Sequence, residues 1–107
     1  MDAIKREYDK IIEKKDSTEE GSYTKYLFDK GIEKVVKKVG EEATEVVIAA
    51  IKNDKEELIG EVCDLTYHVL VAMATCGVTL EDVEAELDKR AAKENNFKGE
   101  RKEIINR

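Results

Sequence analysis

The amino-acid sequence predicts an all-α protein, and composition, periodicity and spacing each indicate this fold class. The 107-residue chain is 41% hydrophobic and 41% charged, with no Pro and six Gly, a balance typical of amphipathic helices. Two long segments, 32–53 and 55–76, repeat apolar residues at helical spacing and are separated only by a short turn. Because such a turn makes long helices antiparallel, we expect one domain, residues 1–107, that is a helical bundle built on this pair.

Two shorter helices are predicted before the long pair. Apolar side chains recur at helical spacing over residues 2–14, and the polar stretch 15–21 ends that pattern. Ser22 is a favoured N-cap residue, and it precedes a short run that is rich in Tyr, Leu and Phe. Gly31 follows at a position where a left-handed residue commonly ends a helix. We therefore expect a first helix, a loop and a short second helix.

The two long helices carry apolar stripes, and one more helix follows them. The stripe of segment 32–53 consists of Ile32, Val35, Val36, Val39, Ala43, Val46, Val47 and Ala50. The stripe of segment 55–76 consists of Leu58, Val62, Leu65, Val69, Ala72, Met73 and Cys76. Gly77 ends that segment, and Thr79 opens the last helix with Asp82 as its capping partner. The tail, 94–107, is polar and is expected to fray.

Charge and apolar run length exclude several classes of partner. The formal net charge of -6 opposes the phosphate attraction that drives nonspecific duplex binding, so we expect no nucleic-acid partner. The longest apolar run, 46–51, is far shorter than a membrane span, and the charged N-terminus leads into no signal-peptide region. Cys63 and Cys76 lie about 20 Å apart on one predicted helix and cannot pair within it. We expect a soluble cytoplasmic protein with no membrane partner.

The expected core is lean. Aromatic residues make up only 6% of the chain, so Val, Ile, Leu and Ala must supply most of the buried surface. A monomer of this size with such a core has marginal stability. We therefore expect an oligomer, most simply a homodimer, to complete the bundle.

Carboxylates flank the apolar stripes of both long helices. Glu41, Glu42 and Glu45 project over an arc of about 100° beside the first stripe. Glu61 and Asp64 are three residues apart on one flank of the second helix, with Glu61 nearly inside its stripe. Packing of the two stripes would bring both sets of acids together near the middle of the pair.

Four carboxylates around one small volume repel one another, and the simplest neutraliser is a hard divalent cation with oxygen ligands. We predict Mg²⁺, for which Mn²⁺ could substitute. The predicted ligands are Glu42, Glu45, Glu61 and Asp64. The alternative is that these acids form only a solvated face, as acidic pairs on helices commonly do.

The cations near these acids have two interpretations. Lys34 and Lys38 share the flank of Glu42, and Lys38 lies four residues before Glu42, which is the spacing of a helical ion pair. Lys38 could instead contact a phosphate beside the metal, and spacing does not decide between the two. His68, the only histidine, lies four residues after Asp64 and could pair with it, although such a residue is more often structural.

With these residues laid out, the sequence resembles the phosphoribosyl-ATP pyrophosphohydrolase family over about residues 22–90. The matching motifs are Ser22-Tyr23-Thr24, Lys30-Gly31, Lys38-Val39-Gly40-Glu41-Glu42-Ala43 with Glu45-Val46, and Asp64-Leu65 with Tyr67-His68. Their combination is specific, although no single motif is. The two acidic pairs alone are similar to the wider all-α superfamily of nucleotide pyrophosphohydrolases that includes the MazG type.

The resemblance implies hydrolysis of 1-(5-phosphoribosyl)-ATP to 1-(5-phosphoribosyl)-AMP and pyrophosphate, the second step of histidine biosynthesis, by a Mg²⁺-dependent helical homodimer. It maps the active-site acids onto Glu42, Glu45, Glu61 and Asp64, with Glu41 as a further catalytic candidate that would receive the proton of the attacking water. Lys38 is then expected to contact phosphate. Other candidates for substrate binding are Ser22, Thr24, Lys30, Lys34 and His68.

Two other functions are open to the sequence. The first is a house-cleaning pyrophosphohydrolase of the same superfamily that acts on a nucleoside triphosphate. The second is a non-catalytic helical interaction module whose acids are only surface charge. A panel of substrates separates the two enzymes, and the absence of any Mg²⁺ effect on stability or activity would indicate the module.

Overall fold

Five helices and no strand are present in the residues that the computed structural model describes, 2–17 and 20–96. They are α1 (Asp2–Lys15), α2 (Tyr23–Lys30), α3 (Ile32–Lys52), α4 (Lys55–Cys76) and α5 (Leu80–Asn96). The all-α fold class is therefore confirmed, with helix bounds close to the predicted ones. The polar tail differs at its start, because residues 94–96 belong to α5. Residues 97–107 lie outside the described part of the chain.

Local capping interactions explain where the helices begin and end. The Ser22 hydroxyl accepts a hydrogen bond from the Lys25 amide at 3.2 Å, as expected of an N-cap residue. Gly31, with φ of 94°, ends α2 and directly precedes α3, a conformation that favours glycine. At the start of α5 the Thr79 hydroxyl accepts from the Asp82 amide, and the Asp82 carboxylate accepts from the Thr79 amide. This is the predicted reciprocal capping box.

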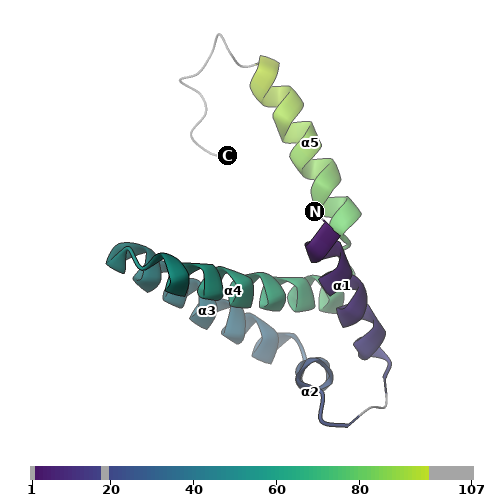
Figure 1. Cartoon of the computed structure of the whole chain (residues 1–107). Helices are drawn as coiled ribbons and strands as arrows, with labels where there is room; N and C mark the ends of the chain where they lie inside the picture. The colour runs from purple at the N-terminus through teal and green to yellow at the C-terminus, as the bar shows by residue number, and fades with distance from the viewer. Residues whose placement is uncertain (1, 18–19, 97–107) are drawn as a thin grey trace.

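The predicted antiparallel hairpin is the centre of the fold. Figure 1 shows α3 and α4 side by side along most of their length. Asn53 ends α3 in the left-handed conformation, with φ of 58°, and the Asp54 carboxylate caps α4 by accepting from the Glu57 amide at 3.1 Å. Because the turn takes only these two residues, acids on facing flanks of the two helices are held at matching heights.

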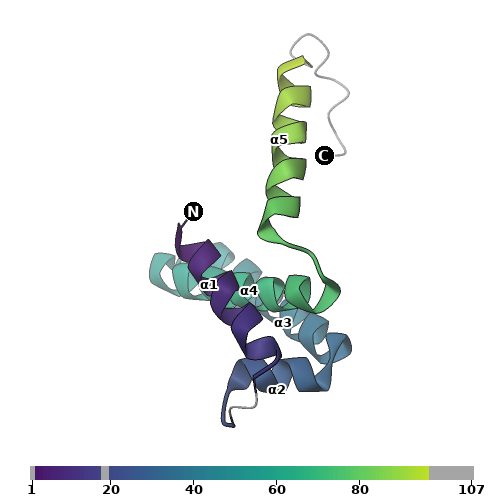
Figure 2. The same ribbon diagram turned by 90° about the vertical axis from the view of Figure 1, so that its right-hand side faces the viewer.

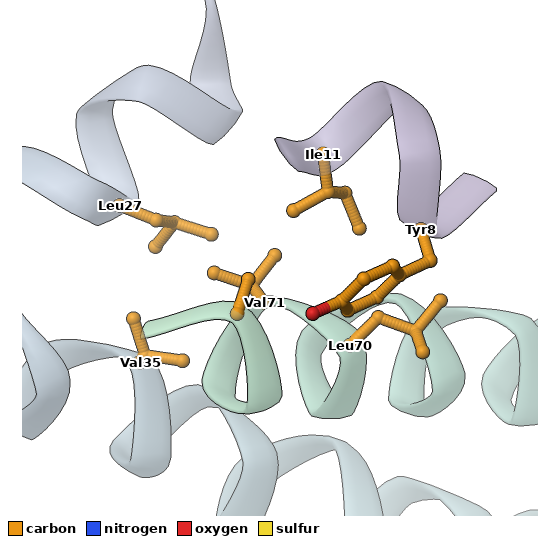
Figure 3. Packing of buried hydrophobic residues seen from close by; sticks show 7 residues of the cluster. Tyr8, Ile11, Leu27, Val35, Leu70 and Val71 are labelled. Atoms are coloured by element: carbon orange, nitrogen blue, oxygen red, sulfur yellow. The ribbon is translucent and has the colours of Figure 1, made fainter. Parts of the chain in front are cut away.

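The buried core lies at one end of this hairpin, where α1 and α2 pack against it. Its buried members are Tyr8, Ile11, Leu27, Val35, Leu70, Val71 and Ala74. In Figure 3, Ile11 and Tyr8 of α1 lie over Val71 and Leu70 of α4, while Leu27 and Val35 approach from the other side. The Tyr8 hydroxyl also donates to the Val78 carbonyl at 2.8 Å, which ties α1 to the segment after α4.

Much of the predicted apolar surface is exposed in the single chain. The members of the two predicted stripes that remain exposed are Ile32, Val36, Val47, Ala50, Val62, Val69 and Cys76. The expectation that the hairpin closes through these stripes is therefore only partly right. The physical reason differs between the two ends of the hairpin. Where α1 and α2 pack, the core residues of α4 are Leu70, Val71 and Ala74, which lie outside the predicted stripe, so Val69 and Cys76 stay exposed. Towards the turn at Asn53, no described helix covers the hairpin.

The last helix extends away from the rest of the molecule, as Figures 1 and 2 both show. Every residue of α5 from Glu81 to Lys93 is exposed, including the apolar side chains of Val83 and Leu87. Among the side chains of α5 that are described, residues 80–93, only Leu80 packs against the core. A 17-residue helix without tertiary packing has little stability of its own, so α5 lacks the partner surface that its apolar side requires.

Candidate functional site

Three of the predicted metal ligands converge between the two long helices. Glu42 of α3 and both Glu61 and Asp64 of α4 offer carboxylate oxygens that lie within 4.8 Å of one another. We call these three residues the acid group. Glu42 and Glu61 are half-buried, whereas Asp64 is exposed. These three acids therefore lie together, as their positions on the two helices predicted, and their role as metal ligands stays a prediction.

Glu61 is affected both by burial and by the negative charges of its neighbours. Its pKa is raised, first by burial and then by the negative charges of Glu45, Glu42 and Asp64. A hydrogen bond with Glu42 raises it further. Glu45, the fourth predicted ligand, therefore lies near enough to act on Glu61 electrostatically, although it is not one of the three converging acids.

The donor set fits a hard divalent cation. Carboxylate oxygens are the ligands that Mg²⁺ prefers, and a bound cation would remove the repulsion that raises the pKa of Glu61. Within residues 2–17 and 20–96, no ion pair joins a member of the acid group to a lysine or arginine. Among the described residues the acid group thus has no cation at ion-pair distance, and metal binding would offset its negative charge.

Lys38 lies on α3 beside the acid group but pairs with a different acid. Its ammonium is 3.4 Å from a carboxylate oxygen of Glu41, so the ion pair forms at a spacing of three residues and not with Glu42. The pKa of Lys38 is raised, chiefly by its hydrogen bond with Glu41 and next by Tyr23. Glu41 is more exposed than Lys38 and contributes no oxygen to the acid group. The fifth predicted acid is therefore a neighbour of the lysine.

His68 is buried and has a polar neighbour on each ring nitrogen. Only 6% of its surface is exposed. Its Nδ1 lies 2.8 Å from the backbone carbonyl of Asp64, and its Nε2 lies 3.2 Å from the hydroxyl of Tyr23. Tyr67 packs edge-on against the imidazole with ring centroids 4.9 Å apart. The contact with Asp64 is made to its backbone, so the carboxylate is left for other ligands.

Tyr23 and Tyr67 both pack against His68 and were not predicted as site residues from sequence spacing. Their rings lie 6.2 Å apart between centroids, and the Tyr67 hydroxyl hydrogen-bonds to the Thr24 hydroxyl. Burial raises the pKa of Tyr67. Both tyrosines stand inside motifs that carry the family resemblance, Ser22-Tyr23-Thr24 and Tyr67-His68, and this was the available signal.

The remaining predicted substrate-binding residues lie on or beside α2. The Ser22 hydroxyl serves as its N-cap, and the Thr24 hydroxyl is engaged with Tyr67. The ammonium groups of Lys30 and Lys34 lie 5.8 and 6.0 Å from the centroid of the Tyr26 ring, within the range of cation–π attraction. The structure thus gathers both lysines around one aromatic face, and substrate contact by these four residues stays a prediction.

The raised pKa of Glu61 predicts a pH-dependent stability in the absence of divalent cations. The folded protein holds the Glu61 proton more tightly than the unfolded chain does, so this contribution to stability is full below the ordinary value of 4.5 and is lost as pH rises through the raised pKa. Glu61→Gln removes the charge at every pH. In EDTA, we expect the variant to have the higher Tm near neutral pH, by thermal unfolding followed by circular dichroism.

The same comparison supplies its own control. As pH falls towards 4.5, the parent becomes protonated at Glu61 and the Tm difference from Glu61→Gln should shrink. A difference that is constant across this range, or a parent that is more stable than the variant near neutral pH, would contradict the assignment of strain to Glu61.

Comparison with known proteins places the chain in a family. The model of the phosphoribosyl-ATP pyrophosphohydrolase family matches residues 5–91, which include the whole acid group. A phosphoribosyl-ATP pyrophosphatase of Clostridium novyi (strain NT) is 50% identical over 106 residues, 99% of this chain and 96% of that protein. A protein of the same name from Listeria monocytogenes serotype 4a (strain HCC23) is 57% identical over 97 residues, 91% of this chain and 92% of that protein. The chain therefore belongs to the phosphoribosyl-ATP pyrophosphohydrolase family.

Proposed function

We propose that this protein hydrolyses 1-(5-phosphoribosyl)-ATP to 1-(5-phosphoribosyl)-AMP and pyrophosphate, the second step of histidine biosynthesis. The observation that carries the proposal is the convergence of Glu42, Glu61 and Asp64 in a chain whose relatives, at 50% and 57% identity, are named phosphoribosyl-ATP pyrophosphatase. A small nucleotide is thus the expected partner. A soluble enzyme of this kind is expected to work in the cytoplasm.

The acid group is the proposed binding site for Mg²⁺. Glu42, Glu61 and Asp64 would hold the cation, and Glu45 lies close enough to join them. When bound, Mg²⁺ supplies charge neutralisation at the phosphate oxygens and acidifies water. The helices α3 and α4 hold these carboxylates at matching positions along the hairpin. The carboxylates therefore need little rearrangement when the substrate binds.

Lys38 and Glu41 are proposed to act beside the metal. The Lys38 ammonium has three donors, and its ion pair with the more exposed Glu41 uses only part of them. A substrate phosphate can therefore bind Lys38 in competition with Glu41. A carboxylate freed in this way would be available to accept the proton of the attacking water.

A second copy of this chain is the proposed cover for the exposed apolar surface. At the end of the hairpin away from α1, Ile51 and Ile59 are 80% and 56% exposed, and Leu87 of α5 is 58% exposed. By length and composition alone α4 could cross a membrane, but a single such helix is weak support, and α4 carries two acids of the acid group. Pairing of two chains would bury this surface while leaving the flank of the acids open.

A substrate panel tests the proposed activity. Purified protein is incubated with phosphoribosyl-ATP, ATP or dCTP, with Mg²⁺ or with EDTA, and pyrophosphate release is measured. We expect Mg²⁺-dependent release from phosphoribosyl-ATP and little from the other two. Preferential release from ATP or dCTP would indicate the house-cleaning activity instead, and no release from any nucleotide would indicate a non-catalytic module.

A further inference from the structure

Two lysines and an aromatic ring gather where α2 meets the start of α3, the junction that Figure 1 shows at one end of the hairpin. The Lys30 ammonium lies 5.8 Å from the centroid of the Tyr26 ring, and the Lys34 ammonium lies 6.0 Å from the same centroid. Tyr26 and Lys30 are exposed, and Lys34 is half-buried. We call these three residues the cation cluster.

The lysines of the cation cluster differ from neighbouring lysines in their partners. Lys25 of α2 pairs with an aspartate at 3.0 Å, and Lys38 of α3 pairs with a glutamate at 3.4 Å. In the described part of the chain, no ion pair includes Lys30 or Lys34. Because the protein has a net charge of -6, an anion that binds it needs such a local concentration of positive charge.

Packed side chains connect the cation cluster with the acid group. The rings of Tyr26 and Tyr23 stack with centroids 6.0 Å apart. The Tyr23 hydroxyl lies 3.2 Å from Nε2 of His68, whose Nδ1 lies 2.8 Å from the backbone carbonyl of Asp64. These contacts join α2 to α4, so the fold determines where Tyr26 lies relative to the acids that are proposed to bind metal.

The cation cluster is too far from the acid group to share its phosphate. Lys34 and Glu42 are eight residues apart on α3, since 42 minus 34 is 8, which corresponds to about 12 Å along the helix axis. Mg²⁺ holds its oxygen ligands at about 2.1 Å, so a phosphate at Lys34 lies beyond the reach of a metal at Glu42. Lys38 lies between the two positions on the same flank of the helix.

We propose that the cation cluster binds the phosphate of the 1-phosphoribosyl group, the phosphate that distinguishes phosphoribosyl-ATP from ATP. This inference rests on the proposed function, which supplies a substrate with a triphosphate on one ribose and a single phosphate on the other. Lys30 and Lys34 contact the phosphate oxygens. Tyr26 is a positioning residue that holds both ammonium groups beside one ring. The cluster thus determines specificity and takes no part in the chemical step.

Ribose 5-phosphate is the probe for the cation cluster, because it carries the proposed phosphate and requires no turnover. It is titrated in EDTA, so that no divalent cation can bind phosphate at the acid group, and the ring signals of ¹³C-labelled tyrosine are followed by NMR. The chain has four tyrosines, and we expect the Tyr26 signal to shift most. Inorganic phosphate should compete, and ribose should have no effect. Equal shifts with ribose, or shifts centred on another tyrosine, would overturn the proposal.

Paired lysine variants separate specific binding from net charge. We expect Lys30→Gln/Lys34→Gln to raise the dissociation constant of ribose 5-phosphate at least about 10-fold. Lys25→Gln/Lys37→Gln makes the same change in net charge on the same two helices, and its dissociation constant should stay within about 2-fold of the parent. An equal loss in both double variants would refute a specific phosphate site. So would a lower Tm with unchanged binding, the result expected if the lysines only join α2 to α3.

Conservative and disruptive changes at position 26 test the positioning role. Tyr26→Phe keeps the aromatic face and should bind ribose 5-phosphate as the parent does. Tyr26→Leu removes the face that holds both ammonium groups and should weaken binding about 3-fold or more. Equal dissociation constants for the two variants would show that the ring does not position the lysines.

Kinetics with phosphoribosyl-ATP provides the second readout. Lys30→Gln/Lys34→Gln should raise KM at least about 10-fold with kcat within about 3-fold of the parent, because a phosphate remote from the reaction is bound equally in the ground and transition states. A parent-like KM in this variant would count against the cation cluster alone. Absence of pyrophosphate release by the parent protein would instead count against the proposed function, so the two failures can be distinguished.

Discussion

Glu61→Gln is expected to lower turnover of phosphoribosyl-ATP by at least about 1,000-fold. Glu61 offers a carboxylate oxygen that lies within 4.8 Å of oxygens of Glu42 and Asp64, and the charge of Glu45 is close enough to raise its pKa. Glutamine keeps the size of the side chain but removes the charge that a divalent cation needs. The loss should appear in kcat/KM, measured as pyrophosphate release at saturating Mg²⁺.

The matched control is Glu57→Gln, one helical turn earlier on α4. The Glu57 carboxylate lies 3.0 Å from the Lys52 ammonium and is not part of the acid group. Its replacement removes an exposed ion pair of little energetic weight, so activity should stay within about 2-fold of the parent. Circular dichroism should show full helical content in both variants. If Glu61→Gln retained nearly the activity of the parent protein, the proposed role of the acid group in catalysis would be wrong.

Charged replacements on the exposed apolar surface are expected to break the proposed dimer. Ile59 of α4 and Leu87 of α5 are 56% and 58% exposed in the single chain, so each can accept a charge without disturbing the core. In a dimer that buries them, two unpaired carboxylates per chain would weaken association by at least about 100-fold. The variant Ile59→Glu/Leu87→Glu should therefore dissociate at micromolar concentration and unfold at lower temperature.

Light scattering after size-exclusion chromatography measures this effect. The parent should have about twice the 12.1 kDa mass of one chain, and the double variant should approach one. Lys37→Gln/Lys89→Gln is a control with the same change in net charge at two exposed polar positions, and it should remain dimeric. A monomeric parent, or a double variant that associates as tightly as the parent, would contradict the proposed interface.

Local sequence signals predicted the helices because helix ends depend on nearby residues. Ser22 caps α2, Gly77 ends α4 with φ of 75°, and Thr79 with Asp82 opens α5, as the sequence predicted. Each of these interactions spans a few residues, so it can be recognised without knowing the tertiary structure.

Tertiary packing was harder to predict. Apolar spacing predicted one stripe on α4, but the apolar residues that α4 buries in the core, Leu70, Val71 and Ala74, lie outside that stripe. Tyr8 and Ile11 cover Leu70 and Val71 and leave Ile59 bare. Periodicity indicates which side of a helix is apolar and contains no information on the element that packs against it.

At the candidate site, too, some contacts could be predicted from sequence spacing and others depend on tertiary packing. Carboxylates three residues apart on facing helices predicted the meeting of Glu42, Glu61 and Asp64. The ion-pair partner of Lys38 could not be predicted from spacing. On a helix, the residues three and four positions after Lys38, Glu41 and Glu42, lie at nearly the same distance from it, and the side-chain rotamer determines that the pair forms with Glu41. The contact of His68 with Tyr23 joins α4 to α2 and arises only when the helices pack.

The most direct test of the metal site is paramagnetic broadening by Mn²⁺, a substitute for Mg²⁺ that relaxes nearby nuclei. Substoichiometric Mn²⁺ is added to ¹⁵N-labelled protein, and the loss of amide signals is mapped along the chain. We expect the strongest broadening around Glu42, Glu61 and Asp64, with reversal by excess Mg²⁺ and no such focus in Glu61→Gln. Two results would contradict a metal-binding site between α3 and α4. One is broadening centred elsewhere, such as on the acidic surface of α5, and the other is broadening spread evenly over the chain.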